Sequence, residues 1–83
     1  MVSNYAKRYR REDFDTHINI THRPTGFKFY QAGGRINVIF PGDDGIYRLF
    51  TDFTIEALQI EHTVLTEPAL RAAAVTWLKD YLK

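Results

Sequence analysis

The densest group of ionisable side chains in this sequence is a basic run near its start. Four of the eleven basic residues fall within five positions around Tyr9, namely Lys7, Arg8, Arg10 and Arg11. The remaining seven basic residues stand against ten acidic ones, so the run is joined to a body with a formal charge of −3. Such a run can neutralise phosphates or dock on an acidic partner. Acidic residues follow it directly, and in a helix they would cancel part of its charge.

The groups that could do acid–base chemistry are three histidines, with Asp43 and Asp44. His17 and His22 are five residues apart, so on one strand they would point to opposite faces and could not share a metal ion. The segment Pro41–Gly45 lacks the twelve-residue ligand pattern of a calcium loop and is typical of a turn. Because no catalytic spacing is present, we predict that the protein is not an enzyme and holds neither a metal nor a cofactor.

The chain is expected to fold as one domain. Its 83 residues are 45% hydrophobic and 14% aromatic, a composition that argues against disorder. It has no cysteine, so neither disulfides nor a thiolate zinc site can stabilise the fold. The first residues are polar and no run approaches the ~20 apolar residues of a membrane span, so we predict a cytoplasmic protein without membrane contact. We divide it into a basic N-terminal arm at 1–13, mobile or forming a short turn, and a domain at 14–83.

Four alternating segments predict an antiparallel meander, with strands at 16–22, 27–32, 35–40 and 46–51. Gly33 and Gly34 supply the two positive φ values that a tight type I′ hairpin requires. That hairpin places Phe29 opposite Val38, and a four-residue turn at 23–26 places Ile20 opposite Phe29. Both registers gather the same side chains on one face. That face is predicted to hold Ile18, Ile20, Phe27, Phe29, Ile36, Val38 and Phe40.

The third hairpin has two possible registers. A four-residue loop adds Tyr47 and Leu49 to the apolar face, whereas an odd loop adds Ile46 and Phe50. An odd loop would also remove Arg48 from the opposite, open face of the sheet.

Two helices are predicted after the strands. Asp52 is a plausible N-cap for a short helix reaching residue 62, although a fifth strand there is the alternative. For the final helix, Thr66 is the predicted cap, and Glu67 and Pro68 occupy the first turn. Its predicted core stripe, which would cover the apolar face of the sheet, consists of Leu70, Ala73, Ala74, Trp77, Leu78 and Tyr81.

The open face of the sheet is the second candidate binding surface. It is predicted to carry cations around one central aromatic ring, that of Tyr30, with Ile39 and, in the even register, Ile46 and Phe50. A base could stack on Tyr30 while Lys28 and the arginines hold phosphates. The same apolar side chains could instead contact another protein. His17 beside Tyr30 is the one arrangement here that could support acid–base chemistry, and no spacing motif backs it.

The sequence therefore predicts an α+β fold: a four-stranded antiparallel meander followed by a short helix and a longer C-terminal helix packed on one face. The predicted function is a small non-enzymatic binding module, a homo-oligomer and specifically a homodimer, that contacts an unidentified protein partner. The contact would use the open sheet face and the basic arm. The alternative is a nucleic-acid-binding protein that uses the same two surfaces. The predicted binding residues are Lys7, Arg8, Tyr9, Arg10, Arg11, Lys28, Tyr30, Arg35 and Arg48.

Overall fold

A computed structural model describes residues 7–17, 19–61 and 63–83. One antiparallel sheet follows the chain in the order β1-β2-β3-β4-β5. Its strands are β1 (Phe14–Asp15), β2 (Ile20–His22), β3 (Lys28–Ala32), β4 (Arg35–Pro41) and β5 (Tyr47–Phe53). A 3-10 turn, η2 (Arg11–Asp13), precedes the sheet, and α1 (Glu56–Glu61) and α2 (Glu67–Tyr81) follow it. The predicted α+β class is confirmed, with one more strand than the sequence indicated.

The additional strand, β1, lies at the boundary where we placed the start of the domain. Phe14 pairs with His22, and Asp15 pairs with Thr21. Phe14 is buried in the core. The predicted strand at 16–22 is shorter than expected because β2 begins at Ile20. The expectation that Ile18 joins the apolar face falls outside the described residues.

The first two hairpins have the predicted registers. Ile20 pairs with Phe29 and Phe29 pairs with Val38, so the three side chains share one face of the sheet. The Gly33–Gly34 turn has φ values of 60° and 75°, as the type I′ hairpin requires. The first loop closes with the His22 N–H donating to the Phe27 carbonyl over 2.8 Å.

The third hairpin has an odd loop of five residues. Pro41 pairs with Tyr47, and Phe40 pairs with Arg48. A bulge follows, because Ile39 pairs with Leu49 whereas Val38 pairs with Thr51. The extra residue in β5 is Phe50, whose ring lies 5.1 Å from that of Phe27 on the helix side. The odd register of the two alternatives is therefore confirmed, and Tyr47 and Leu49 lie on the open face.

The helices agree with the sequence in part. The Thr66 side chain accepts a hydrogen bond from the Ala69 N–H, which confirms the predicted cap of α2. Asp52 is not a cap, since it lies inside β5 and pairs with Asn37. The short helix starts later, at Glu56. No helix in the described part of the chain is long and apolar enough to cross a membrane.

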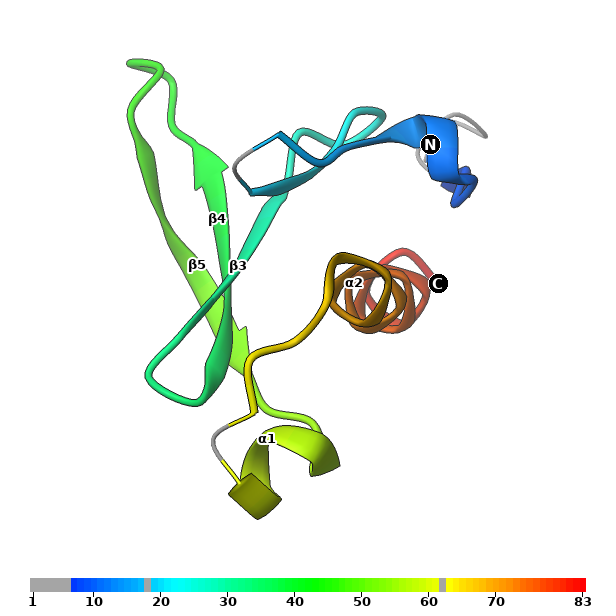
Figure 1. The fold of residues 1–83 in the computed structure, drawn as a ribbon. Coiled ribbons are helices and arrows are strands. Elements are labelled where there is room, and N and C mark those ends of the chain that lie inside the picture. The colour runs from blue at the N-terminus through cyan, green and yellow to red at the C-terminus, as the bar shows by residue number, and fades with distance from the viewer. Residues whose placement is uncertain (1–6, 18, 62) are drawn as a thin grey trace.

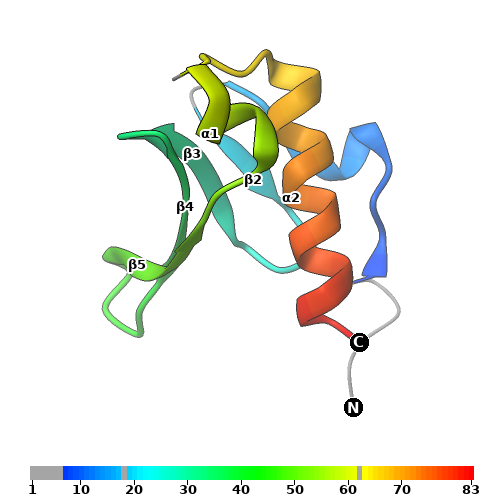
Figure 2. The same cartoon turned by 90° about the horizontal axis from the view of Figure 1, so that it is seen from below.

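A single helix, α2, covers about half of the sheet. It contacts β2 and β3, and it runs between the N-terminal segment on one side and the β4–β5 hairpin on the other (Figures 1 and 2). The most deeply buried core residues of α2 are Ala74 and Leu78. They pack in one cluster with side chains of the sheet and of α1, namely Phe14, Ile20, Phe27, Phe29, Ile36, Val38 and Leu58.

Replacing Gly33 with valine is expected to destabilise the protein by about 2 kcal/mol, because a β-branched residue resists positive φ. A Cβ at this position meets no atom within 4 Å, so the backbone conformation alone is responsible. Chemical denaturation measures the loss. Gly33→Asn is the matched control and should lose much less, since asparagine tolerates this conformation. Equal losses for the two variants would contradict the explanation.

Candidate protein-contact surface

Exposed hydrophobic side chains gather on the β4–β5 hairpin. Seven large hydrophobic residues of the described chain are exposed, and five of them lie between residues 40 and 50. These five are Phe40, Ile46, Tyr47, Leu49 and Phe50. A hairpin normally turns one apolar side to the core and a polar side to water. Here both sides of one hairpin carry apolar residues.

The side of the hairpin that faces away from α2 forms an apolar patch on the open face. Leu49, with 61% of its surface exposed, pairs with Ile39. Next to this pair, the Lys28 Nζ lies 4.4 Å from the centroid of the Tyr47 ring. A cation held over an aromatic face is attracted to it, so Lys28 is oriented toward Tyr47. The predicted open face therefore exists, with Leu49 and Tyr47 added to it.

The helix side of the hairpin is aromatic. The Phe27 ring lies at the centre of a group of aromatic rings. The distance from its centroid is 4.7 Å to the Phe40 ring, 5.1 Å to the Phe50 ring and 5.4 Å to the Tyr81 ring. Phe50 also meets Trp77 and Tyr81 edge-on. The rings of Phe40, Phe50 and Tyr81 remain partly open to solvent. The edge of the core is thus an apolar surface.

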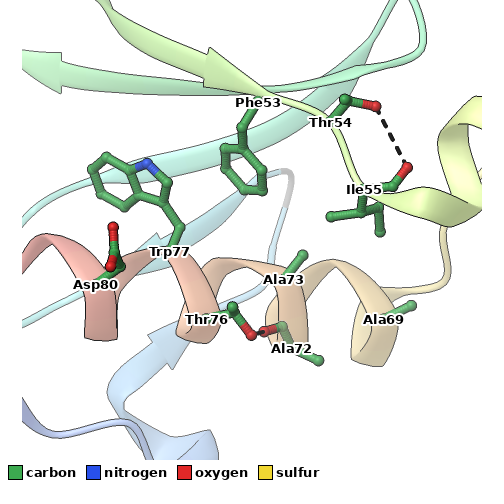
Figure 3. Close-up of a pocket in the computed structure, with 9 residues that line it drawn as sticks. All are labelled: Phe53, Thr54, Ile55, Ala69, Ala72, Ala73, Thr76, Trp77 and Asp80. Atoms are coloured by element: carbon green, nitrogen blue, oxygen red, sulfur yellow. Dashed lines mark hydrogen bonds between the residues drawn. The ribbon is translucent and has the colours of Figure 1, made fainter.

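A groove of about 660 Å³ separates α2 from the end of β5. An α-helix is ~10 Å wide and strands lie ~4.8 Å apart, so one helix covers about two strands. Since α2 lies over β2 and β3, it covers the helix side of β5 only in part, through the contacts of Trp77 with Phe50 and Phe53. Figure 3 shows small side chains of α2 below and Phe53 above. The lining residues are Phe53, Thr54, Ile55, Ala69, Ala72, Ala73, Thr76, Trp77 and Asp80.

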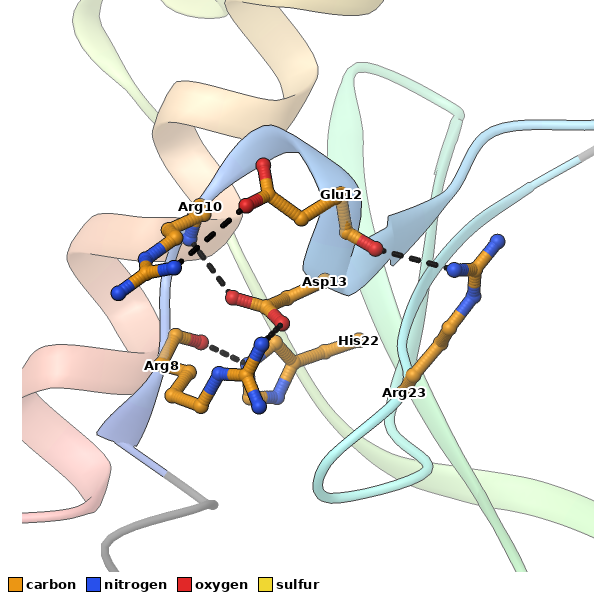
Figure 4. Close-up of polar contacts among 6 residues, drawn as sticks. All are labelled: Arg8, Arg10, Glu12, Asp13, His22 and Arg23. Atoms are coloured by element: carbon orange, nitrogen blue, oxygen red, sulfur yellow. Dashed lines mark hydrogen bonds and ion pairs between the residues drawn. The ribbon is translucent and has the colours of Figure 1, made fainter.

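Ion pairs within the described part of the basic arm hold its own residues together. The Arg8 guanidinium lies 3.0 Å from the Asp13 carboxylate, and that of Arg10 lies 3.7 Å from Glu12 (Figure 4). The Arg10 N–H also donates to the Asp13 carboxylate over 3.0 Å. Tyr9 packs against the core, and the Lys79 Nζ of α2 lies 5.6 Å from its ring centroid. Residues 1–6 of the predicted arm lie outside the described residues.

Two predicted cations of the sheet are paired with acids. Arg35 lies 3.1 Å from Asp52. Arg48 is not on the open face, because it pairs across the ladder with Phe40, and its guanidinium contacts Asp44 at 2.7 Å. This hydrogen bond from Arg48 holds the pKa of the Asp44 carboxyl below its usual value. Arg48 was predicted on the open face for an even loop, and it lies on the other face because the loop is odd.

The predicted binding residues do not form one surface. Lys28 and Tyr30 share the open face, and Tyr30 pairs with Asn37 as expected. The basic arm does not continue that face: Tyr9 stacks on His22, whose partner Phe14 belongs to the core on the helix side. His17 lines a small polar hollow on the open face with Asp15, Asn19, Thr21 and Lys28. No group of metal-ligating side chains suited to hold an ion occurs within the described ranges.

Leu49, Tyr47 and Phe40 are not among the binding residues that the sequence predicts. The signal is present, because the segment 46–50 is apolar at four of its five positions. The even register, however, assigns Tyr47 and Leu49 to the apolar face that α2 would cover and only Ile46 and Phe50 to the open face, and Phe40 is predicted on the covered face in both registers. Comparison with protein-family models, curated proteins and solved structures finds no match. We therefore infer the function from the geometry of the chain itself.

Proposed function

We propose that this chain is a non-enzymatic binding module of the cytoplasm that acts by protein–protein contact and forms a homodimer through its β4–β5 hairpin. The observation that supports this most is the gathering of exposed apolar side chains on both sides of one hairpin. Scattered exposed hydrophobics are ordinary, whereas a contiguous group of this kind marks an interaction surface. The groove between α2 and the end of β5 extends the helix side of this surface, where Phe50 meets Trp77.

The energetics favour burial of this surface. Fully burying one leucine or phenylalanine side chain contributes about 1.5–3 kcal/mol. Leu49, Phe50 and Ile46 are each about half exposed or more, so each has apolar area left to bury. A stable interface takes about 800 Å² from each partner. The chain exposes 5671 Å² in total, so the hairpin and its adjoining groove would need to supply about one seventh of it.

A second copy is the partner that fits the size of the chain. A domain of 83 residues has a small core, and association enlarges it. The hairpin side chains that the single α2 leaves uncovered are the ones that a second copy would enclose. A twofold contact would present the same apolar patch on both sides of the interface.

Nucleic-acid binding remains the alternative proposal, and the arrangement of charges disfavours it. Four of the seven cations predicted to hold phosphates already pair with carboxylates of this chain, namely Arg8, Arg10, Arg35 and Arg48. A phosphate would have to displace those carboxylates. The positive charges also lie on different sides of the sheet, which weakens the field that a phosphate backbone would meet.

Replacing Leu49 with lysine is expected to weaken the dimer strongly while leaving the monomer folded. Its side chain is largely exposed, so the substitution removes contact area rather than core packing. The thermal midpoint of the wild-type protein should rise with protein concentration, as mass action requires for a dimer. In Leu49→Lys the midpoint should be independent of concentration.

Val64→Lys is the matched control, since Val64 is 84% exposed and lies outside the hairpin. It introduces the same charge and should keep the concentration dependence of the wild type. If the two variants behave alike, the hairpin is not the contact surface. Circular dichroism of both variants checks that the fold is intact.

A further inference from the structure

His22 connects the N-terminal segment to the sheet from a fully buried position. Its exposed fraction is 0%, although its side chain is polar. The Nε2 lies 2.6 Å from the Arg8 carbonyl oxygen, and the Nδ1 lies 2.8 Å from the Thr25 hydroxyl. Tyr9 stacks on one side of the ring at 5.8 Å, and Phe14 lies 5.0 Å away. The ring therefore bridges two segments that are 14 residues apart in sequence.

The hydrogen bonds define the state of the ring. A carbonyl oxygen only accepts, so the Nε2 must carry the proton that it donates to Arg8. In the neutral ring, Nδ1 then accepts from the Thr25 hydroxyl. Burial lowers the pKa of His22 below its usual value, while the hydrogen bond to the Arg8 carbonyl and the Asp13 carboxylate oppose this shift. The neutral ring is thus the form that this site holds.

The charged groups around the ring come from three sides and largely cancel. The N-terminal segment contributes the Arg8–Asp13 ion pair (Figure 4). The loop after β2 contributes Arg23, whose guanidinium donates to the Glu12 carbonyl rather than to the ring. From α2, the Lys79 ammonium lies over the ring of Tyr9. The Asp13 carboxylate is the acid nearest to the ring, and Arg8 already neutralises it.

Protonation of the ring disturbs this arrangement. A second proton on Nδ1 points at the Thr25 oxygen, so the hydroxyl must turn its own hydrogen to the His22 carbonyl, an acceptor 3.4 Å away. The new positive charge is buried without a carboxylate of its own, which is unfavourable. The charge can reach water only if the segment that covers the ring moves. The covering segment is the described part of the basic arm, residues 7–13.

We propose that His22 is a pH-sensitive latch that holds residues 7–13 against the domain when neutral and releases them when protonated. Release separates the segment, with its internal Arg8–Asp13 and Arg10–Glu12 pairs, from the domain surface. The latch is independent of the proposed dimer, because the N-terminal segment lies on the other side of α2 from the β4–β5 hairpin (Figure 2). It makes exposure of the basic arm a function of acidity.

Hydrogen exchange of single amides in the wild-type protein tests the latch. The Arg23 amide reports on docking of the segment, since it donates to the Asp13 carbonyl across the boundary between the segment and the domain. Between about pH 7.5 and pH 5, around the ordinary pKa of histidine, its protection should fall about tenfold. The Leu82 amide, bonded to the Leu78 carbonyl in α2, is the internal reference and should keep its protection.

His22→Gln should remove the pH dependence, because glutamine can donate to the Arg8 carbonyl but takes up no proton in this range. His17→Gln is the matched control at an exposed histidine and should behave as the wild type. If His22→Gln does not fold, NMR titration of the wild-type histidine rings replaces it. The His22 ring and the loss of protection must then share one midpoint. Unchanged protection at low pH, an equal loss in folded His22→Gln, or two separate midpoints would overturn the proposal.

Discussion

Replacing Trp77 with alanine should lower the free energy of unfolding by about 3 kcal/mol, near the lower end of large-to-small core changes. The indole meets Phe27 and Phe29 edge-on at 5.3 and 5.6 Å, and it stacks on Tyr81 at 5.0 Å. It also stacks on Phe53 at the end of β5. The indole is therefore the main connection between α2 and the half of the sheet that α2 does not cover.

Urea denaturation followed by circular dichroism measures the effect. Thr76→Ala is the matched control, since Thr76 is exposed on the next position of α2 and bonds only the Ala72 carbonyl of its own helix. It should change stability by less than about 0.5 kcal/mol. A loss below about 1 kcal/mol for Trp77→Ala would show that α2 is not docked on the sheet as described.

Replacing Asp13 with alanine is expected to lower stability by about 2–3 kcal/mol, because hydrogen bonds to charged groups contribute about 1.5–3 kcal/mol each. The Asp13 carboxylate is 5% exposed and accepts from the Arg10 N–H and the Arg8 guanidinium. Its removal leaves both donors without this acceptor next to β1. The N-terminal segment should detach before the rest of the domain unfolds.

Glu12→Ala provides the comparison, as Glu12 also pairs with an arginine but is exposed. Exposed pairs contribute little, so the loss should stay below about 1 kcal/mol. Thermal unfolding of the two variants at neutral pH distinguishes them. If Asp13→Ala and Glu12→Ala lose the same stability, the buried carboxylate does not hold the segment.

The first two hairpins were predictable because local chemistry determines them. Two consecutive glycines with positive φ allow one tight turn, and this turn sets the register of Phe29 against Val38. Thr66 followed by Glu67 and Pro68 likewise marks the start of α2 from local sequence alone. In each case the residues that decide the structure lie within a few positions of one another.

The features that the sequence did not reveal depend on distant contacts. β1 has two residues, too few to show alternation, and forms because Phe14 reaches the core. Phe50 lies on the helix side because a bulge and an odd loop combine, and neither leaves a pattern in the sequence. His22 is completely buried because the N-terminal segment returns over it, and no local pattern in the sequence indicates this return.

The candidate site shows the same division. The apolar segment 46–50 is visible in the sequence, but its exposure follows from the width of one helix against five strands. The cations predicted for the open face were visible too, yet the pairing of Arg48 with Asp44 and of Arg35 with Asp52 is a property of the folded hairpin. The composition therefore indicated an apolar and a cationic surface. Only the folded structure shows that the apolar side chains are exposed and that Arg35 and Arg48 are paired with acids.

Sedimentation equilibrium of the wild-type protein tests the central claim most directly. One chain has a mass of 9.7 kDa, so the homodimer has twice that mass. Over about 1–100 µM at physiological salt, the fitted mass should rise toward the dimer, and Leu49→Lys should stay at the monomer. A wild-type mass of 9.7 kDa at every concentration would contradict the homodimer.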